Sequence, residues 1–184
     1  MPTLLFDTET TGLLKPNNII LERQPKIIEF YGILLDKNFN PLDEVNTLIH
    51  PGEPLSPEIT RITGINDSAL RGKPSFGEVA PDIISIFRAA DLSIAHNIAF
   101  DNGMLANEFS RIGAEFVRPK HELCTSEVIQ KLDGKRMGLG VLHNRLLGTK
   151  FSAHRAKDDV HALIRIYHKL LIMGGIIPDD ICKD

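Results

Sequence analysis

The sequence predicts one α/β domain in which a mixed sheet is flanked by helices. Its 184 residues are the size of one ordinary domain, and its 42% hydrophobic and 24% charged residues are typical of globular proteins. Strand-like segments come early in the chain, and later strands alternate with helical patterns. No repeat, low-complexity run or linker divides the chain, so we expect a single domain over residues 1–184.

Most of the strand signals lie in the first half of the chain. Thr3–Thr8 is short and apolar and is followed by Gly12, which indicates a buried strand. Lys26–Asp36 is rich in β-forming residues and ends in the turn-like stretch KNFNP, after which comes Val45–His50. These two segments predict a hairpin or meander, and Asp91–His96 predicts a further short strand.

Helical spacing of apolar residues dominates the second half. Ser56 and Pro57 have the residue types of an N-cap and a first helical position. Longer helices are expected at Ser75–Ala90, Ala99–Ile112 and Arg155–Met173, with short ones at Glu127–Leu132 and Leu139–Leu147. The helix at Arg155–Met173 has the clearest apolar face.

Composition bears on the cellular setting. No run of about 18 apolar residues indicates a membrane span, and the N-terminus lacks the basic region of a signal peptide. Cys124 and Cys182 are far apart and form no metal-type pair, which predicts free thiols in a reducing compartment. We therefore expect a cytoplasmic protein without membrane contact.

The charge of the chain is unevenly distributed. The formal net charge is −3, yet the segment Lys131–Lys169 holds nine Lys and Arg residues against three acids. Such a segment could track the phosphates of a nucleic acid. The alternative is a set of ordinary solvated helix faces.

Two acids share one face at the end of the first predicted strand. Asp7 and Glu9 are two residues apart, so their side chains point the same way, while Leu4 and Phe6 point into the core. Two neighbouring carboxylates repel each other and lose hydration, and a divalent cation would relieve both costs. The alternative is a solvated strand end with two acids of no special role.

A third acid, Asp101, follows the strand at 91–96 and lies at the start of a predicted helix. It is a further candidate metal ligand. A structural alternative is equally direct, because an aspartate at this position stabilises a helix N-terminus.

The segment SAHRAKDDVHAL (152–163) offers two adjacent acids and a histidine. Asp159 shares its helix face with apolar residues such as Leu163 and is the better candidate for a metal site. Asp158 lies on the polar face, where we expect a surface pair with Arg155. His154 precedes the helix and is close enough to reach the same site, although a histidine at a helix start is often only solvated.

Four carboxylates and one histidine together suit phosphoryl transfer with two metal ions. Two ions about 3.5–4 Å apart stabilise the attacking and leaving oxygens in such sites. A histidine with a pKa near neutrality can take the proton of the attacking water. No Gly-rich phosphate loop, serine nucleophile elbow or cysteine cluster in the sequence competes with this interpretation.

Three motifs resemble those of the DEDDh (DnaQ-like) exonucleases, a family that includes the proofreading subunit of bacterial DNA polymerase III and RNase T. They are FDTETTGL (6–13), HNIAFD (96–101) and HRAKDDV (154–160), in the order of the family. The segment IHPGEPLSPEITRITGIND (49–67) is also similar to the family's linker before the second motif. The resemblance spans about 170 residues.

The resemblance implies an RNase H-like fold with a central mixed five-stranded sheet, and two Mg²⁺ or Mn²⁺ ions. The positions that match the family's metal-binding acids are Asp7, Glu9, Asp101 and Asp159, and His154 matches its general base. Together these five would be the catalytic residues.

The resemblance also implies contacts with the terminal nucleotide. The substrate-binding residues would be Thr10, Gly12, Leu13 and Ile65 within the segment 62–65. Arg155, in the basic segment Lys131–Lys169, is a further candidate for binding the substrate. Gly12 and Leu13 have structural alternatives, a turn and a core position. Thr63 stands where many members have histidine, and Cys124 stands where an aspartate is common, which we interpret as a packing residue.

We therefore expect a metal-dependent 3′→5′ exonuclease that releases nucleoside monophosphates from single-stranded 3′ ends, with DNA favoured over RNA. The alternatives are an exoribonuclease that trims RNA 3′ ends and, from another class, a non-catalytic nucleic-acid-binding module. About ten residues follow Gly174, which favours a stand-alone exonuclease or a small replication and repair accessory. A polymerase or replication complex and a second copy of the chain, forming a homodimer, are the protein partners to test.

Overall fold

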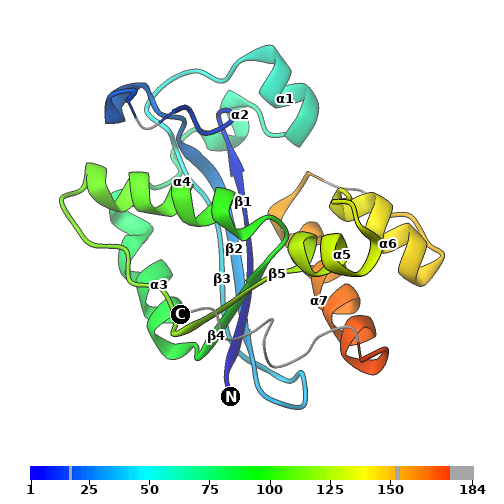
Figure 1. Ribbon diagram of the computed structural model, residues 1–184. Helices are drawn as coiled ribbons and strands as arrows, with labels where there is room; N and C mark the ends of the chain where they lie inside the picture. The colour runs from blue at the N-terminus through cyan, green and yellow to red at the C-terminus, as the bar shows by residue number, and fades with distance from the viewer. Residues whose placement is uncertain (17, 152–153, 175–184) are drawn as a thin grey trace.

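In a computed structural model of the protein, a five-stranded sheet lies between two layers of helices (Figure 1). The structure describes residues 1–16, 18–151 and 154–174. The strand order is β3-β2-β1-β4-β5, and the strands are β1 (Thr3–Thr10), β2 (Ile27–Leu35), β3 (Pro41–Leu48), β4 (Leu92–Ala95) and β5 (His121–Cys124). The expected mixed α/β fold with five strands is thereby confirmed.

Strand β1 lies at the centre of the sheet. It pairs antiparallel with β2 and parallel with β4, and β2 and β3 form the predicted hairpin. The strand runs two residues beyond the expected Thr3–Thr8, so that Glu9 is still part of it. Strand β5 had no clear pattern in its four residues, HELC, because such a short strand is determined by its pairing with β4 rather than by propensity.

The helices agree with the sequence prediction to within a few residues. They are α1 (Pro57–Thr63), α2 (Asp67–Leu70), α3 (Phe76–Ala89), α4 (Ile98–Arg111), α5 (Thr125–Asp133), α6 (Leu139–Leu147) and α7 (Ala156–Ile172), with a 3-10 turn at Leu21–Arg23. Ser56 is the N-cap of α1, as expected, and its hydroxyl accepts a hydrogen bond from the Ile59 N–H at 3.3 Å. The short α2 and the 3-10 turn were not predicted.

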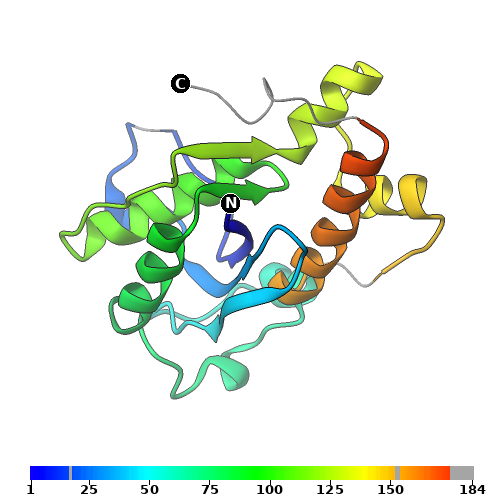
Figure 2. The ribbon, with the colours of Figure 1, turned by 90° about the horizontal axis from the view of Figure 1, so that it is seen from below.

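Each face of the sheet has its own hydrophobic core. Figure 2 shows from below that helices cover both faces. Helices α3 and α4 cover the face that carries Leu4 and Phe6 of β1, in agreement with their predicted inward direction. Helices α5, α6 and α7 cover the other face, which carries Leu5. Since side chains alternate along a strand, Asp7 and Glu9 project on the same side as Leu5, toward α7.

Cys124 is buried in the core beneath α3 and α4, which confirms its packing role. Cys182 lies outside the described residues. Among the helices that the structure describes, none is long and apolar enough to cross a membrane.

Candidate active site

The candidate site lies at the carboxyl end of β1. Pairing between β1 and β4 runs from Thr3–Leu92 to Leu5–Ile94 and then stops, whereas β1 continues through Asp7. The chain leaves β4 and turns into α4, and the first turn of that helix comes beside the freed end of β1. Active sites of α/β sheets commonly form at the carboxyl ends of adjacent parallel strands.

Asp101 connects α4 to β1. It lies in the first turn of α4 and is 2% exposed, and its Oδ1 accepts hydrogen bonds from the Thr8 backbone N–H (3.1 Å) and the Thr8 hydroxyl (2.7 Å). The N-cap of α4, Asn97, makes no capping bond with its side chain. Asp101 thus does more than stabilise its own helix end, because its carboxylate is bound to the strand that carries Asp7.

The last helix presents Asp159 to the site. Asp159 is 7% exposed whereas Asp158 is exposed, which confirms that Asp159 lies on the inward face of the helix. Oδ2 of Asp159 accepts a hydrogen bond from the backbone N–H of His154 at 2.9 Å. Its Oδ1 is buried and has no hydrogen-bond partner among the described residues.

Three acids come together closely enough to bind one ion. Asp7, Glu9 and Asp159 each offer a carboxylate oxygen that lies within 4.8 Å of the other two. Asp101 is adjacent to this group but does not meet the same distance limit. Carboxylate oxygens are the ligands that Mg²⁺ and Mn²⁺ prefer, and the unpartnered Oδ1 of Asp159 lacks the donor or cation that a buried oxygen needs. The residues therefore fit a divalent cation.

Burial raises the pKa values of all four acids, and neighbouring negative charges add to this effect at Asp7, Glu9 and Asp159. Burial, and then repulsion from Asp101 and Asp159, raise the pKa of Asp7 well above its usual range. Burial and the charge of Asp159 raise the pKa of Glu9 to about 8. Burial raises the pKa of Asp101 to about 7 despite the bonds from Thr8, and that of Asp159 to about 6 despite the N–H bond it accepts. Full ionisation of the four carboxyl groups is therefore unfavourable in the folded chain unless a cation is bound.

His154 stands at the mouth of this acidic cluster. Its side chain is exposed, and its backbone has a φ of 73°, in the left-handed region that non-glycine residues seldom adopt. Such strain occurs where surrounding contacts hold the backbone, and here the bond to Asp159 does so. The imidazole is free to approach a substrate.

The end of β1 and the segment after it carry three of the residues that we expect to contact a nucleotide. The Thr10 hydroxyl donates a hydrogen bond to the carbonyl of Gly12 at 2.8 Å and shapes the turn there. Leu13 is 81% exposed, so its alternative role as a core residue is wrong. Leu14 instead faces inward onto α4, where a Cβ added at Gly103 would lie only 2.6 Å from its Cδ1.

Ile65 is a correction to the expected substrate contacts. Its side chain is 2% exposed and packs with Ile28 and Leu70, because the chain turns inward after the left-handed Gly64. The neighbouring Thr63 is buried as well. Ile65 therefore packs against Ile28 of β2, and its burial argues against direct contact with a substrate.

Arg155 has a different partner from the one expected. Its Nε and Nη2 donate hydrogen bonds to the carboxylate of Glu29 on β2 at 2.7–3.2 Å, rather than to Asp158. The role of Glu29 was missed, although an acid within the apolar run IIEFYGILL is unusual and could have drawn attention to it. About half of the Arg155 side chain, 48%, remains exposed.

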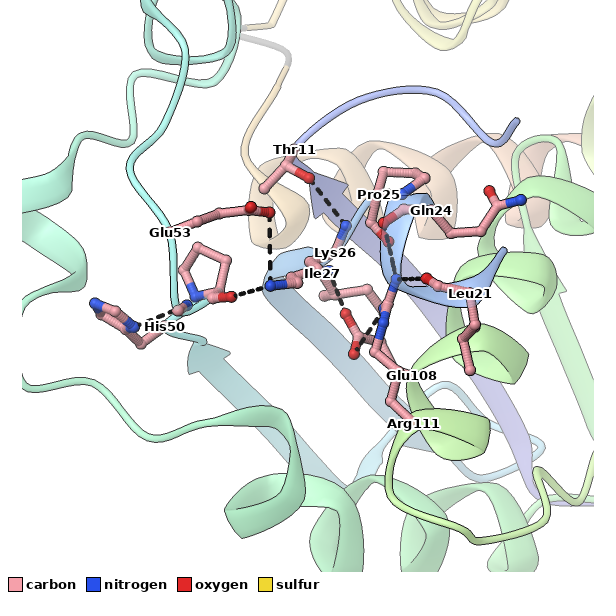
Figure 3. Close-up of polar contacts among 12 residues, drawn as sticks. Thr11, Leu21, Gln24, Pro25, Lys26, Ile27, His50, Glu53, Glu108 and Arg111 are labelled. Carbon is pink, nitrogen blue, oxygen red and sulfur yellow. Dashed lines mark hydrogen bonds and ion pairs between the residues drawn. The ribbon is translucent and has the colours of Figure 1, made fainter. Parts of the chain in front are cut away.

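A second polar network lies at the other end of α4 and holds the loop between β1 and β2 (Figure 3). Arg111 donates hydrogen bonds from Nη2 to the carbonyls of Leu21, Gln24 and Pro25 at 2.8–3.1 Å. Glu108 accepts the Ile27 N–H at 2.8 Å and pairs with Nη1 of Arg111 at 3.0 Å. These contacts fix the segment that carries Leu13 to the helix that carries Asp101.

The strand order and the two helical layers match the RNase H-like fold of known exonucleases. The family model described as "Exonuclease" matches residues 4–167. The chain belongs to this family and is a 3′→5′ exonuclease of the DnaQ-like type.

Curated relatives include two kinds of replication protein. The chain is 31% identical over 178 residues to DNA polymerase III subunit epsilon of Haemophilus influenzae, covering 94% of this chain and 67% of that protein. It is 31% identical over 170 residues to the PolC-type DNA polymerase III of Caldanaerobacter subterraneus subsp. tengcongensis, covering 91% of this chain. The chain spans only 11% of that polymerase.

Solved structures share the fold at low identity. Exonuclease X in complex with 5′ overhanging duplex DNA superposes with a TM-score of 0.71 at 20% identity, over 97% of this chain and 96% of that one. The nuclease domain of 3′hExo, a DEDDh family member bound to rAMP, gives a TM-score of 0.78 at 16% identity, over 100% and 96%. These similarities establish the architecture.

Proposed function

We propose that the chain, as one domain over residues 1–184, hydrolyses single-stranded nucleic acid from the 3′ end and releases nucleoside monophosphates, with DNA favoured. The observation that carries this proposal is the group formed by Asp7, Glu9 and Asp159, three crowded carboxylates beside the exposed His154. DNA is favoured because the relatives that match over most of this chain are named as DNA polymerase III proteins.

The acids would hold two Mg²⁺ or Mn²⁺ ions, which supply charge stabilisation for the attacking and leaving oxygens. Asp7, Glu9 and Asp159 are the nearest ligands, and Asp101 completes the set from α4. His154 takes the proton of the attacking water on its imidazole, which must be neutral to do so. Leu13 packs against the terminal base, because an exposed apolar side chain can cover the face of any base.

The basic segment Lys131–Lys169 is expected to contribute less than its charge suggests. Among the described residues of this segment, at least four basic side chains already form ion pairs, namely Arg136 with Glu127, Arg145 with Asp133, Arg155 with Glu29 and Lys157 with Glu44. We therefore expect the enzyme to neutralise few phosphates and its affinity to fall only gently as salt rises. The exposed part of Arg155 remains a proposed phosphate contact.

The test is digestion of matched single strands of DNA and RNA that are labelled at either the 3′ or the 5′ end, with Mg²⁺, Mn²⁺ or a chelator. We expect mononucleotides released first from the 3′ label, with metal only, and faster from DNA. A 3′-phosphate end or a closed circle should resist. Equal cutting of blocked and free ends would show an endonuclease, and faster release from RNA would favour the alternative exoribonuclease.

Its partners and setting form a separate part of the proposal. We place the chain in the cytoplasm, with a DNA polymerase complex as the protein partner that its relatives suggest. Light scattering of the purified chain would distinguish a monomer from the homodimer that we also considered.

A further inference from the structure

A fifth buried carboxylate lies beside the candidate metal ligands. Glu29 of β2 is paired directly with Glu9 of β1, and side chains opposite each other in antiparallel strands share one face of the sheet. Glu29 is buried and is the one charged residue of β2. Both of its oxygens accept hydrogen bonds, from Nε and Nη2 of Arg155 and from the backbone N–H of Ala156 at 3.0 Å. Glu29 therefore finds its hydrogen-bond donors and its counter-charge within the protein.

These bonds attach the beginning of α7 to the sheet. Ala156 is the first residue of α7, and its N–H is one of the donors for which a helix has no carbonyl of its own. The N-cap residue, Arg155, makes no capping bond with its side chain, so Glu29 supplies a capping carboxylate from a neighbouring strand. A carboxylate is favourable at this end of the helix dipole. The planar guanidinium of Arg155 adds two directed bonds that a lysine could not reproduce.

His154 directly precedes the residues that Glu29 holds. Its backbone has a left-handed φ of 73°, and its N–H donates to Asp159. Two acids thus bind three consecutive residues. Asp159 accepts a hydrogen bond from His154, and Glu29 accepts hydrogen bonds from Arg155 and Ala156. Without the Glu29 contacts, only the hydrogen bond to Asp159 would remain among these contacts to hold the unfavourable backbone conformation of His154.

We propose that Glu29 is a positioning residue that places His154 for proton transfer by holding Arg155 and the first turn of α7. This proposal rests on the proposed function, because it takes His154 as the general base. Glu29 acts through protein contacts, and its own carboxylate binds no metal. The partner of Arg155 is thus part of the catalytic geometry and is not an ordinary surface ion pair.

The test is a double-mutant cycle between Glu29→Gln and His154→Ala. Glu29→Gln retains the size of the side chain but loses the charge that binds Arg155. We expect kcat to fall about 10–100-fold, with little change in KM for the substrate or in Mn²⁺ affinity measured by calorimetry. On the His154→Ala background, Glu29→Gln should change kcat by a factor of less than about two.

A matched control exists on the same helix turn. Glu44 of β3 pairs with Lys157 at 3.2 Å, so this pair also joins the sheet to the start of α7, but both side chains are largely exposed. Glu44→Gln should keep kcat close to that of the wild type, since exposed pairs contribute little. If Glu29→Gln does not fold, Arg155→Lys replaces it in the double-mutant cycle. This change keeps the positive charge and removes the planar guanidinium that donates two hydrogen bonds to Glu29.

Three outcomes would overturn the proposal. They are a wild-type kcat in Glu29→Gln, a loss that multiplies fully with that of His154→Ala, or a loss of Mn²⁺ affinity as large as in Asp159→Asn. Failure of the proposed function looks different, because the wild type itself would then release no nucleotides. In that case NMR still tests the contact between Glu29 and Arg155. The resonance of the Arg155 Nε–H should shift in Glu29→Gln, and this proton should exchange with solvent faster than it does in Glu44→Gln.

Discussion

Helix α4 carries a buried acid near each end, and the two acids have opposite surroundings. Near its C-terminal end, Glu108 pairs with Arg111 and accepts the Ile27 N–H (Figure 3). At its N-terminal end, Asp101 accepts hydrogen bonds from Thr8 and lies beside other acids. Within the described residues, no Lys, Arg or His side chain forms an ion pair with Asp101 or with the three acids grouped beside it.

The difference separates structural acids from functional ones. A buried charge is tolerated when the protein supplies its counter-charge and hydrogen bonds, as Arg111 does for Glu108 and Arg155 does for Glu29. The acids at the end of β1 lack such partners, and their pKa values are raised. Their counter-charge must come from outside the chain, which is the condition for a metal site.

The largest expected effect comes from removing an acid without a counter-charge. Asp7→Ala or Asp159→Asn should abolish nearly all nucleotide release in Mg²⁺, because each change removes a metal ligand. The matched control is Asp158→Ala, which alters the exposed neighbour of Asp159 and should retain most activity. Release of labelled nucleotide measures all three. Substantial turnover by Asp7→Ala would refute the proposed mechanism, and a large loss in Asp158→Ala would refute the assignment of Asp159.

The second effect concerns the general base. His154→Ala should lower kcat about 10²–10⁴-fold and leave Mn²⁺ affinity largely unchanged, since the imidazole moves a proton and is no ligand of the proposed site. Calorimetry and single-turnover kinetics measure the two quantities. A wild-type rate in this variant would show that His154 is merely a solvated residue at the start of α7.

The third effect concerns Glu108, the buried acid that has a counter-charge within the protein. Arg111→Met leaves Glu108 buried without its counter-charge and removes three bonds to the loop between β1 and β2. We expect the free energy of unfolding in urea to fall by about 3–5 kcal/mol. By contrast, Asp7→Asn in chelator should leave the protein as stable or more stable, because it relieves repulsion. Equal destabilisation by both changes would remove the distinction between the two groups of acids.

The smallest effect is a pH dependence that only the metal-free protein should show. The pKa values of Glu9, Asp101 and Asp159 are about 8, 7 and 6, whereas carboxyls of an unfolded chain titrate near pH 4. Between about pH 4 and pH 8 the folded chain binds more protons than the unfolded chain, so the contribution of these acids to stability falls as pH rises.

Calorimetry of the chelated protein should therefore show a Tm that decreases from about pH 5 to pH 8. Saturating Mg²⁺ should restore more stability at the higher pH, where the acids are ionised and bind metal best. Asp7→Asn is the control and should weaken the dependence. A chelated protein whose Tm rises steadily over this range would contradict the assigned shifts.

Local periodicity was sufficient for those parts of the site that lie within one element. The two-residue spacing of Asp7 and Glu9 placed both on one face of β1, and the helical period distinguished Asp159 from Asp158. Both inferences need only the geometry of a strand or a helix. They were confirmed because neither depends on which elements become neighbours in the sheet.

Contacts between distant segments could not be obtained in this way. Glu29 and Arg155 are 126 residues apart, and their contact depends on the pairing of β1 with β2 and on the packing of α7 over that sheet. The inward turn of Ile65 and the exposure of Leu13 depend in the same way on what packs around them. Such features follow from tertiary structure, which propensity and spacing do not encode.

The left-handed backbone of His154 makes the proposed base replaceable by a small molecule. A glycine adopts a φ of 73° without strain, so His154→Gly should preserve the path of the chain into α7 while removing the imidazole. Because the side chain is exposed, free imidazole can diffuse to the vacated position. Added imidazole should then restore part of the turnover of His154→Gly, in proportion to its neutral form, and should do nothing for Asp7→Ala. The backbone strain of this residue thus provides a route to chemical complementation of the enzyme.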